Sequence, residues 1–375
     1  MRIGVPKEIK NQEYRVGLTP ASVREAVARG HDVLVEHNAG QGIGVSDDAY
    51  RAAGARIADS AEELYANAEL IVKVKEPQHA ERALLREGQV VFAYLHLAPD
   101  PEQAEGLLAS GVTALAYETV TDARGGLPLL APMSEVAGRM SVQAGASSLE
   151  KVAGGRGVLL GGVPGVEPAE VAILGAGVVG TNAAVIASGI GARVTVIDRS
   201  IDVLRRIGER FGSAVATVHA SHDAIERTVL KADLVIGAVL IPGANTPRLV
   251  TREMVRAMQP GAVIVDVAID QGGCCETSRP TTHDAPTYLV DDVVHYCVAN
   301  MPGGVARTST HALNAATLPH VLAIADKGWQ KALADDPYLA TGLNVHAGQV
   351  CHAEVAEALK RPVTSLRYAL GADFA

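Results

Sequence analysis

The stretch EVAILGAGVVGTNAAVIASGIGARVTVID, from Glu170 to Asp198, decides the fold of this chain. An apolar run from Val171 to Leu174 leads directly into a G-x-G-x-x-G turn at Gly175, Gly177 and Gly180. A helical apolar pattern, a second β-rich run and an acid follow. This order of strand, glycine turn, helix, strand and acid is typical of a dinucleotide-binding βαβ unit.

Each glycine of the turn has its own physical role. Gly175 permits the tight turn, Gly177 lets backbone amides approach a pyrophosphate, and Gly180 lets the helix pack closely on the strand. Asp198 lies where an acid accepts hydrogen bonds from the adenosine ribose, and its charge would repel a 2′-phosphate. We therefore expect NAD, with the neighbouring Arg199 leaving NADP as the alternative. The cofactor contacts expected from the turn are Gly175, Gly177, Val178, Val179 and Gly180.

Composition bounds the class of protein. A chain of 375 residues is long enough for two domains, and its net charge of −9 argues against nucleic-acid binding, which needs a basic surface. Every apolar run is broken well before the ~18 residues of a membrane span. Met1 leads almost directly into a strand, without a secretory signal. We expect a soluble, cytoplasmic protein with no membrane partner.

The cysteines and histidines show no metal-binding pattern. Four cysteines and 12 histidines are scattered without C-x-x-C or H-E-x-x-H spacing. We therefore expect reduced structural thiols and no metal. The cysteines are Cys274, Cys275, Cys297 and Cys351.

Before the dinucleotide unit, short apolar runs alternate with helical patterns, which predicts a parallel sheet. Ligands of such sheets bind beyond the carboxyl ends of the strands. Arg15, Lys75, His96 and Glu118 each follow a predicted strand. Taken singly, each could be a solvated charge or a buried histidine. Their shared placement favours a substrate site. The predicted strands are 2–5, 32–36, 70–74, 90–95 and 112–117.

The second half of the chain predicts the domain organisation. A Gly/Pro-rich linker at 121–132 precedes a long helix that Ser134 would cap. Residues beyond 308 show a helical pattern to about 360, and we expect them to return to the first domain. The prediction is an α/β fold of two Rossmann-like domains with parallel sheets: a discontinuous substrate domain (1–128 and 307–375) and an inserted NAD domain (129–306). The second sheet is expected at 158–160, 171–174, 194–197, 214–218, 233–240, 262–269 and 296–299.

These residues suggest an oxidation by NAD. Such a reaction needs a base that removes a proton from the heteroatom on the reacting carbon. His96 has an intrinsic pKa of ~6.5, which suits proton exchange near neutrality. Arg15 could clamp a carboxylate, and Lys75 could polarise a carbonyl. Asp270, after the predicted strand 262–269, could assist proton transfer. The substrate would be an α-amino or α-hydroxy acid.

Segments spread over nearly the whole chain resemble the alanine dehydrogenase family, which interconverts L-alanine and pyruvate with NAD and ammonia. They are MRIGVPKEIKNQEYRVGLTP, VKVKEP around Lys75, AYLHLA around His96, LAPMSEVAGRM, GAGVVG, VDVAIDQGG around Asp270, SRPTTHD and VANMPGGV. The chain departs from the family's pattern at Val203 and Ala220, near the expected adenosine.

The resemblance implies a role for each matching residue. Arg15 would bind the substrate carboxylate and Lys75 the carbonyl oxygen of pyruvate, while His96 and Asp270 would be the catalytic acid-base pair. It also implies a homohexamer working in L-alanine catabolism. The further substrate contacts implied are Tyr94, Met133 and Asn300, and the further cofactor contacts are Ser134, Asp198, Val239, Leu240, Val267, Asp270 and Met301.

Three alternatives remain open from the sequence. The NAD-binding part of proton-translocating transhydrogenase is similar at 133–139, but it carries a loop that this chain lacks at 125–132. A dehydrogenase of the same fold that acts on lysine-derived substrates would need a larger pocket. A catalytically silent NAD-binding module would not need Arg15, Lys75, His96 and Asp270 together.

Overall fold

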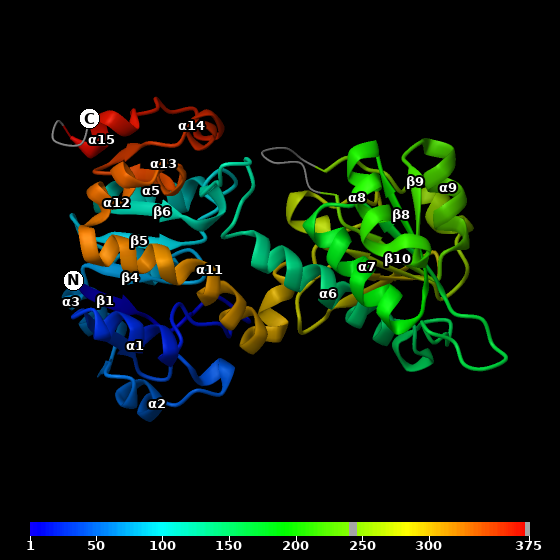
Figure 1. Cartoon of the computed structure of the whole chain (residues 1–375), viewed down its shortest axis with the longest axis horizontal. Coiled ribbons are helices and arrows are strands. Elements are labelled where there is room, and N and C mark those ends of the chain that lie inside the picture. Colours follow the sequence, from blue (N-terminus) through cyan, green and yellow to red (C-terminus); the bar gives the residue numbers. More distant parts are fainter. Residues whose placement is uncertain (240–245, 372–375) are drawn as a thin grey trace. The chain divides into compact units, whose positions relative to one another are not determined.

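The structure, a computed structural model, describes residues 1–239 and 246–371. Over that range no helix combines the length and apolar content needed to cross a membrane. The chain divides into two compact units, unit 1 (Met1–Met133 and Gly303–Ala375) and unit 2 (Ser134–Pro302), so unit 1 is discontinuous (Figure 1). The predicted fold class, α/β with two Rossmann-like domains, is confirmed.

The described part of unit 1 is built on an eight-stranded sheet in the order β15-β14-β6-β5-β4-β1-β2-β3. From β3 to β6 the strands are parallel, and their order reverses between β1 and β4, as in a Rossmann sheet. Strands β14 and β15 are antiparallel additions. The bounds are β1 (Arg2–Val5), β2 (Asp32–Glu36), β3 (Arg56–Ala58), β4 (Leu70–Val72), β5 (Val90–Ala93), β6 (Thr113–Ala116), β14 (Leu343–His346) and β15 (Gln349–Val350).

Several helices of unit 1 begin at a side chain that caps the first turn. Thr19 accepts a hydrogen bond at the start of α1, and Ser60 and Asp100 do the same for α3 and α5. Apolar side chains of α3, α5 and α14 share one core on one face of the sheet. The helices are α1 (Pro20–Ala28), α2 (Asp47–Ala52), α3 (Ala61–Asn67), α4 (His79–Arg82), α5 (Pro101–Ser110), α11 (Ala306–Lys327), α12 (Trp329–Asp335), α13 (Pro337–Ala340), α14 (Ala353–Leu359) and α15 (Leu366–Leu370).

Helix α11 ties the returning chain to the segment that follows Arg15. Buried Asn314 accepts hydrogen bonds from the Thr19 amide (2.7 Å) and the Ser22 hydroxyl (2.8 Å). Its side-chain amide donates to the Gly17 carbonyl (3.0 Å). One buried side-chain amide therefore satisfies two polar groups of the loop before α1 and one hydroxyl in the first turn of α1.

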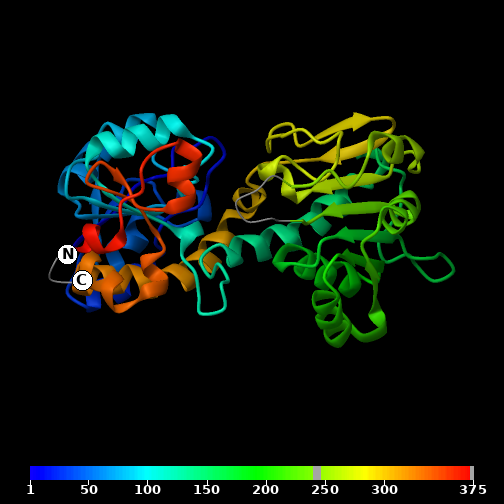
Figure 2. The ribbon, with the colours of Figure 1, turned by 90° about the horizontal axis from the view of Figure 1, so that it is seen from above.

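The described part of unit 2 contains a seven-stranded sheet in the order β12-β13-β11-β10-β7-β8-β9, parallel except for β12. The order reverses between β7 and β10. Helices cover both faces (Figure 2). The strands are β7 (Glu170–Leu174), β8 (Arg193–Asp198), β9 (Val215–His219), β10 (Leu234–Gly237), β11 (Val263–Asp266), β12 (Thr287–Val290) and β13 (Val293–Tyr296).

Alternate residues of the central strands enter two separate cores. Val171 and Ile173 of β7 pack with α6, α7 and α8, whereas Ala172 and Leu174 pack with α9 and α10. Burial on both faces explains the unbroken apolar runs of these strands. The helices are α6 (Ala131–Ser148), which starts in unit 1, α7 (Val178–Ile190), α8 (Ile201–Phe211), α9 (His222–Lys231) and α10 (Arg252–Ala257).

Several predicted elements were wrong. Residues 158–160 form no strand, because the surrounding glycines favour a loop. Helix α6 begins at Ala131 and not after a Ser134 cap. The C-terminal segment is not helical throughout, because β14 and β15 interrupt it and join the first sheet. The last parallel strand was predicted at 296–299, but β13 ends at Tyr296.

Gly180 provides a test of the helix–strand packing in unit 2. A Cβ at this position would lie 1.8 Å from the Gly175 carbonyl oxygen. We expect Gly180→Ala to lower the free energy of unfolding by about 1–3 kcal/mol, because backbone must shift. The control is Gly189→Ala on the same helix, where an added Cβ meets no described atom within 4 Å. It should be neutral or stabilising by up to about 1 kcal/mol. Equal melting temperatures for the two variants would contradict the packing.

Candidate active site

Arg15 is almost fully buried in unit 1 and paired with Glu13 through two hydrogen bonds. Its Nε and Nη2 each donate to a Glu13 carboxylate oxygen at 2.6 Å, and its Nη1 donates to Met133 Sδ at 3.0 Å. Burial alone would lower the pKa of Arg15, but the Glu13 carboxylate outweighs it and raises the pKa. Arg15 is therefore a fixed cation, held in one orientation by Glu13.

Tyr94 lies in the same unit and connects Arg15 to His96. Burial raises the pKa of Tyr94, and the next largest influence on it is the Arg15 charge. Its hydroxyl donates to the Leu129 carbonyl at 2.5 Å, and its ring stacks on His96 at a centroid distance of 6.0 Å. The structure thus brings together four of the five unit 1 residues predicted for the substrate: Arg15, Tyr94, His96 and Met133.

Lys75 follows β4, and its backbone is held by Glu8. Glu8 Oε1 accepts the Val74 amide at 2.7 Å and the Lys75 amide at 3.4 Å. Its other oxygen pairs with buried Lys73 at 3.1 Å, and Lys73 also pairs with Glu81 at 2.6 Å. Burial raises the pKa of Glu8 to about 7 against the opposing charge of Lys73.

His96 follows β5 and has a left-handed backbone conformation, with φ of 48°. This conformation is unfavourable for a non-glycine residue, so surrounding contacts must hold it. Glu118, in the 3₁₀-helix η2 (Tyr117–Thr119), accepts the His96 amide at 2.6 Å and the Leu95 amide at 3.2 Å. The same carboxylate lies 3.8 Å from His96 Nδ1, and the imidazole is about half exposed. Glu118 thus holds the backbone of His96 and lies beside its ring.

In unit 2 the glycine turn connects directly to Asp198. Gly175 has φ of 98°, and Gly177 is the N-cap of α7. Asp198 Oδ2 accepts the Ala176 amide at 2.8 Å, and its Oδ1 accepts the Ser200 amide at 2.8 Å. The space where a Gly177 side chain would stand contains no described atom within 4 Å. An open, amide-lined cradle beside an acid fits a dinucleotide.

Most of the remaining predicted residues of unit 2 follow the carboxyl ends of other strands in the same sheet. Val239 follows β10, while Val267 and Asp270 belong to the 3₁₀-helix η5 (Val267–Gln271) after β11. Asn300 has φ of 66°, and its carbonyl accepts a hydrogen bond from His283 Nε2 at 3.2 Å. Three more predictions need separate mention: Ser134 lies in α6, Met301 begins η6 (Met301–Val305), and Leu240 lies outside the described residues.

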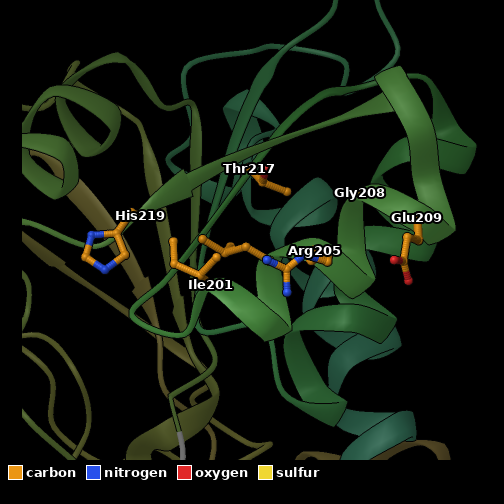
Figure 3. Close-up of a pocket in the computed structure, with 7 residues that line it drawn as sticks. Ile201, Arg205, Gly208, Glu209, Thr217 and His219 are labelled. Atoms are coloured by element: carbon orange, nitrogen blue, oxygen red, sulfur yellow. The ribbon is translucent and has the colours of Figure 1, made fainter.

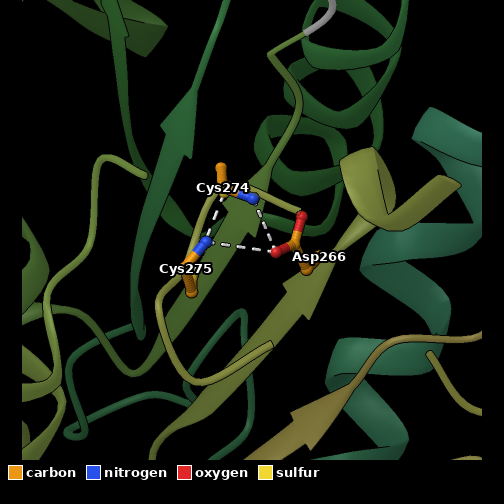
Figure 4. Close-up of side chains that lie close together, drawn as sticks. All are labelled: Asp266, Cys274 and Cys275. Atoms are coloured by element: carbon orange, nitrogen blue, oxygen red, sulfur yellow. Dashed lines mark hydrogen bonds between the residues drawn. The ribbon is translucent and has the colours of Figure 1, made fainter. Parts of the chain in front are cut away.

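One group of potential metal ligands occurs in the described residues. Asp266, Cys274 and Cys275 bring one ligand atom each within 4.8 Å of one another, and all three are buried (Figure 4). The two sulfur atoms are 3.9 Å apart. However, Asp266 Oδ2 already accepts three hydrogen bonds, so the carboxylate has a structural role without an ion.

A pocket of about 570 Å³ lies between helix α8 and strand β9 of unit 2 (Figure 3). None of the residues predicted for the site lines it. Its lining includes Ile201 and His219, and His219 pairs with Asp198 in the sheet register. The other lining residues are Leu204, Arg205, Gly208, Glu209 and Thr217.

The site predicted from the sequence lacks the acidic residues that hydrogen-bond to Arg15, Lys75 and His96. Glu8 and Glu13 lie in the polar segment KEIKNQEYR, and this local sequence predicts that both side chains are exposed to solvent. Glu118 was noticed at a strand end but was given no role. No local signal identifies the partner of Glu8, because Glu8 and Val74 are 66 residues apart. Glu13 lies only two residues from Arg15, but the burial of this pair depends on the fold.

Comparisons with known proteins cover nearly the whole chain. Residues 4–137 match the model of the alanine dehydrogenase/PNT N-terminal domain, and residues 141–353 match that of the C-terminal domain. Alanine dehydrogenase of Halomonas elongata is 62% identical over 96% of each chain. A solved L-alanine dehydrogenase superposes with a TM-score of 0.93 at 53% identity, over 96% of this chain and 99% of the other. A Sinorhizobium meliloti transhydrogenase gives 0.80 at 26% identity, over 94% and 99%.

Glu8 makes the stability of unit 1 depend on pH. Its folded-state pKa of about 7, raised from 4.5, means that folding favours its protonated form. Its contribution to stability therefore falls as pH rises from about 4.5 to 7, by about 1.4 kcal/mol per unit of pKa difference, and then stays constant. The melting temperature of the wild type, compared with that of Glu8→Gln at the same pH, should fall between pH 5 and pH 8. Glu87→Gln, at an exposed acid of unit 1, is the control. Parallel pH curves for the wild type and Glu8→Gln would contradict the shift.

Proposed function

The chain belongs to the alanine dehydrogenase/PNT family, and from this premise we propose that it oxidatively deaminates L-alanine to pyruvate and ammonia with NAD, and catalyses the reverse reductive amination. The observation that carries the reaction is similarity to curated alanine dehydrogenases along nearly the whole chain. The protein is therefore an enzyme of the nicotinamide-dependent dehydrogenase class.

NAD fits the residues of unit 2. The first-turn amides of α7 and the open space at Gly177 suit a pyrophosphate, which a helix N-terminus attracts. Each Asp198 oxygen accepts one backbone amide and keeps acceptor capacity for a ribose hydroxyl. When bound, the cofactor accepts a hydride from the substrate Cα. The charge of Asp198 supports NAD over NADP.

Arg15 would bind the substrate carboxylate. Glu13 holds the guanidinium in one orientation through its Nε and Nη2, which suits a group that binds a carboxylate. Lys75 would bind the carbonyl oxygen of pyruvate. Its backbone is held in place for this role, because Glu8 accepts the amides of Val74 and Lys75. Tyr94, Met133 and Asn300 would complete the contacts with the substrate.

His96 and Asp270 would move the protons. Loss of the Cα hydride leaves an imine after a base removes a proton from the amino group. Water then adds to the imine carbon, and the carbinolamine releases ammonia as a proton returns to nitrogen. His96 is suited to this exchange because its imidazole is half exposed and Glu118 lies beside it. Asp270 is an exposed carboxylate that could activate the water.

The remaining parts of the proposal rest on family resemblance. Further contacts with the cofactor would come from Ser134, Val239, Leu240, Val267 and Met301. A homohexameric assembly, a cytoplasmic location and a role in L-alanine catabolism belong to the same proposal.

The proposed reaction is tested by following NADH absorbance with the purified protein. NADH should accumulate with L-alanine and NAD, and it should disappear with pyruvate, ammonium and NADH. His96→Ala is the matched control, which should abolish both reactions while leaving NAD binding intact, because His96 lies in unit 1. Absence of turnover in both directions with intact NAD binding would instead support a silent NAD-binding module. Turnover only of longer, lysine-derived substrates would support the other dehydrogenase class.

Asp198→Asn tests the choice of cofactor. The variant removes the charge but keeps one acceptor oxygen, so NAD should bind more weakly by about 1.5–3 kcal/mol per charge-assisted hydrogen bond lost. NADP should lose less affinity or gain some, because the 2′-phosphate no longer meets a carboxylate. Titration of both cofactors measures the effect. Asp202→Asn, at an exposed acid on α8, is the control. Unchanged NAD affinity in Asp198→Asn would remove the ribose assignment.

A further inference from the structure

The carboxylate of Asp266 closes the loop that follows strand β11. Asp266 is the last residue of β11 and is fully buried. Its Oδ2 accepts three hydrogen bonds, from the amides of Cys274 (2.8 Å) and Cys275 (3.3 Å) and from the Ser278 hydroxyl (2.6 Å). Figure 4 shows the carboxylate directed at the backbone of the two cysteines. One oxygen atom thus fastens the far end of the loop to the strand.

Two glycines make the slot that this carboxylate occupies. A Cβ on Gly273 would lie 2.7 Å from Asp266 Oδ2, and a Cβ on Gly237 would lie 2.9 Å from Oδ1. The same Cβ on Gly237 would also lie 2.3 Å from Cys274 Sγ. Any side chain at either glycine would displace the carboxylate or the loop. The slot therefore fits one arrangement of Asp266 and Cys274.

The loop contains Asp270. Between Asp266 and the cysteines, the chain forms the 3₁₀-helix η5 and then turns through Gly272 and Gly273, both left-handed, with φ of 90° and 79°. Within the loop, Gly273 donates its amide to Ala268 at 3.0 Å. Asp270 itself is exposed, so the hydrogen bonds of the loop act on its backbone and not directly on its carboxylate.

We propose that Asp266 is a positioning residue for the reaction, which clamps the segment from Val267 to Ser278 so that Asp270 keeps the geometry required for proton transfer. This inference rests on the role proposed above for Asp270. An ionised carboxylate suits the clamp because charge-assisted hydrogen bonds are about twice as strong as neutral ones. An asparagine can keep the acceptor oxygen in place, but with weaker bonds.

The vicinal thiols report whether the clamp is closed. Cys274 and Cys275 are both fully buried, and the hydrogen bond and proximity to Cys275, together with burial, raise the pKa of the Cys274 thiol. Release of the loop should expose both thiols to a disulfide reagent such as Ellman's reagent. A Cys351→Ser background removes the partly exposed cysteine. The sulfur of Cys297 contacts the Ser278 hydroxyl, so its modification is followed separately.

The test compares Asp266→Asn, Asp266→Ala and Ser278→Ala in that background. A displacement of a catalytic group by about 1 Å can cost a hundredfold, so we expect Asp266→Asn to lower kcat about ten- to a hundredfold, with KM for alanine and NAD within about threefold. Ser278→Ala should change kcat in the same direction but less, because it removes one of three donors. Asp266→Asn and Ser278→Ala should both react faster with the thiol reagent than the Cys351→Ser parent. Asp266→Ala should be more severe than Asp266→Asn in both measurements.

Three outcomes overturn the inference: wild-type kcat in Asp266→Asn, an effect confined to KM, or a loss of kcat without faster thiol modification. Should Asp266→Ala not fold, Asp266→Asn and Ser278→Ala still decide between these outcomes and the expected one. Asp270→Asn is measured in parallel. Wild-type turnover in Asp270→Asn would show that the proposed function is wrong at this residue. An inactive Asp270→Asn beside a fully active Asp266→Asn would reject the clamp alone.

Discussion

Carboxylates that accept backbone amides just beyond the strand ends are the interaction on which the rest of this structure depends. A parallel sheet leaves amides of the following loop without ladder partners, and buried amides require acceptors. Glu8 supplies one for the segment of Lys75, Glu118 for that of His96, and Asp266 for the loop of Asp270. The sheets bring these segments to one edge within each unit, and the acids then fix each residue individually.

The acids in unit 1 come with buried cations. Lys73 and Arg15 are buried with their carboxylate partners, and removing two charges from water costs several kcal/mol per ion. Such pairs are therefore poor sources of net stability. Their effect is geometric, because a guanidinium with two bonds to Glu13 has one orientation. The same reasoning explains why a left-handed His96 persists, since Glu118 accepts its amide.

The sequence predicts those features that depend on short spacing. The glycine turn, Asp198, the helix caps and the strand-end position of Lys75 and His96 all lie within a few residues of the signal that identifies them. Strand β14 was missed because a four-residue strand is recognised by its partner, and β6 is far away in sequence. Glu8 was missed for the same reason, whereas Glu13 was missed because the burial of its pair with nearby Arg15 depends on the fold. An acid that binds a distant amide has the same local pattern as a solvated one.

The discontinuity of unit 1 has a consequence for synthesis on the ribosome. All the strands of the second sheet come from one continuous segment, Ser134–Pro302, so that unit can fold once this segment has emerged. Asn314 cannot bind the loop at Thr19 until it has itself been translated, and strand β6 cannot pair with β14 until residues 343–346 have been translated. The first 133 residues of the nascent chain therefore keep an open sheet edge until then, and an open edge can pair with another chain.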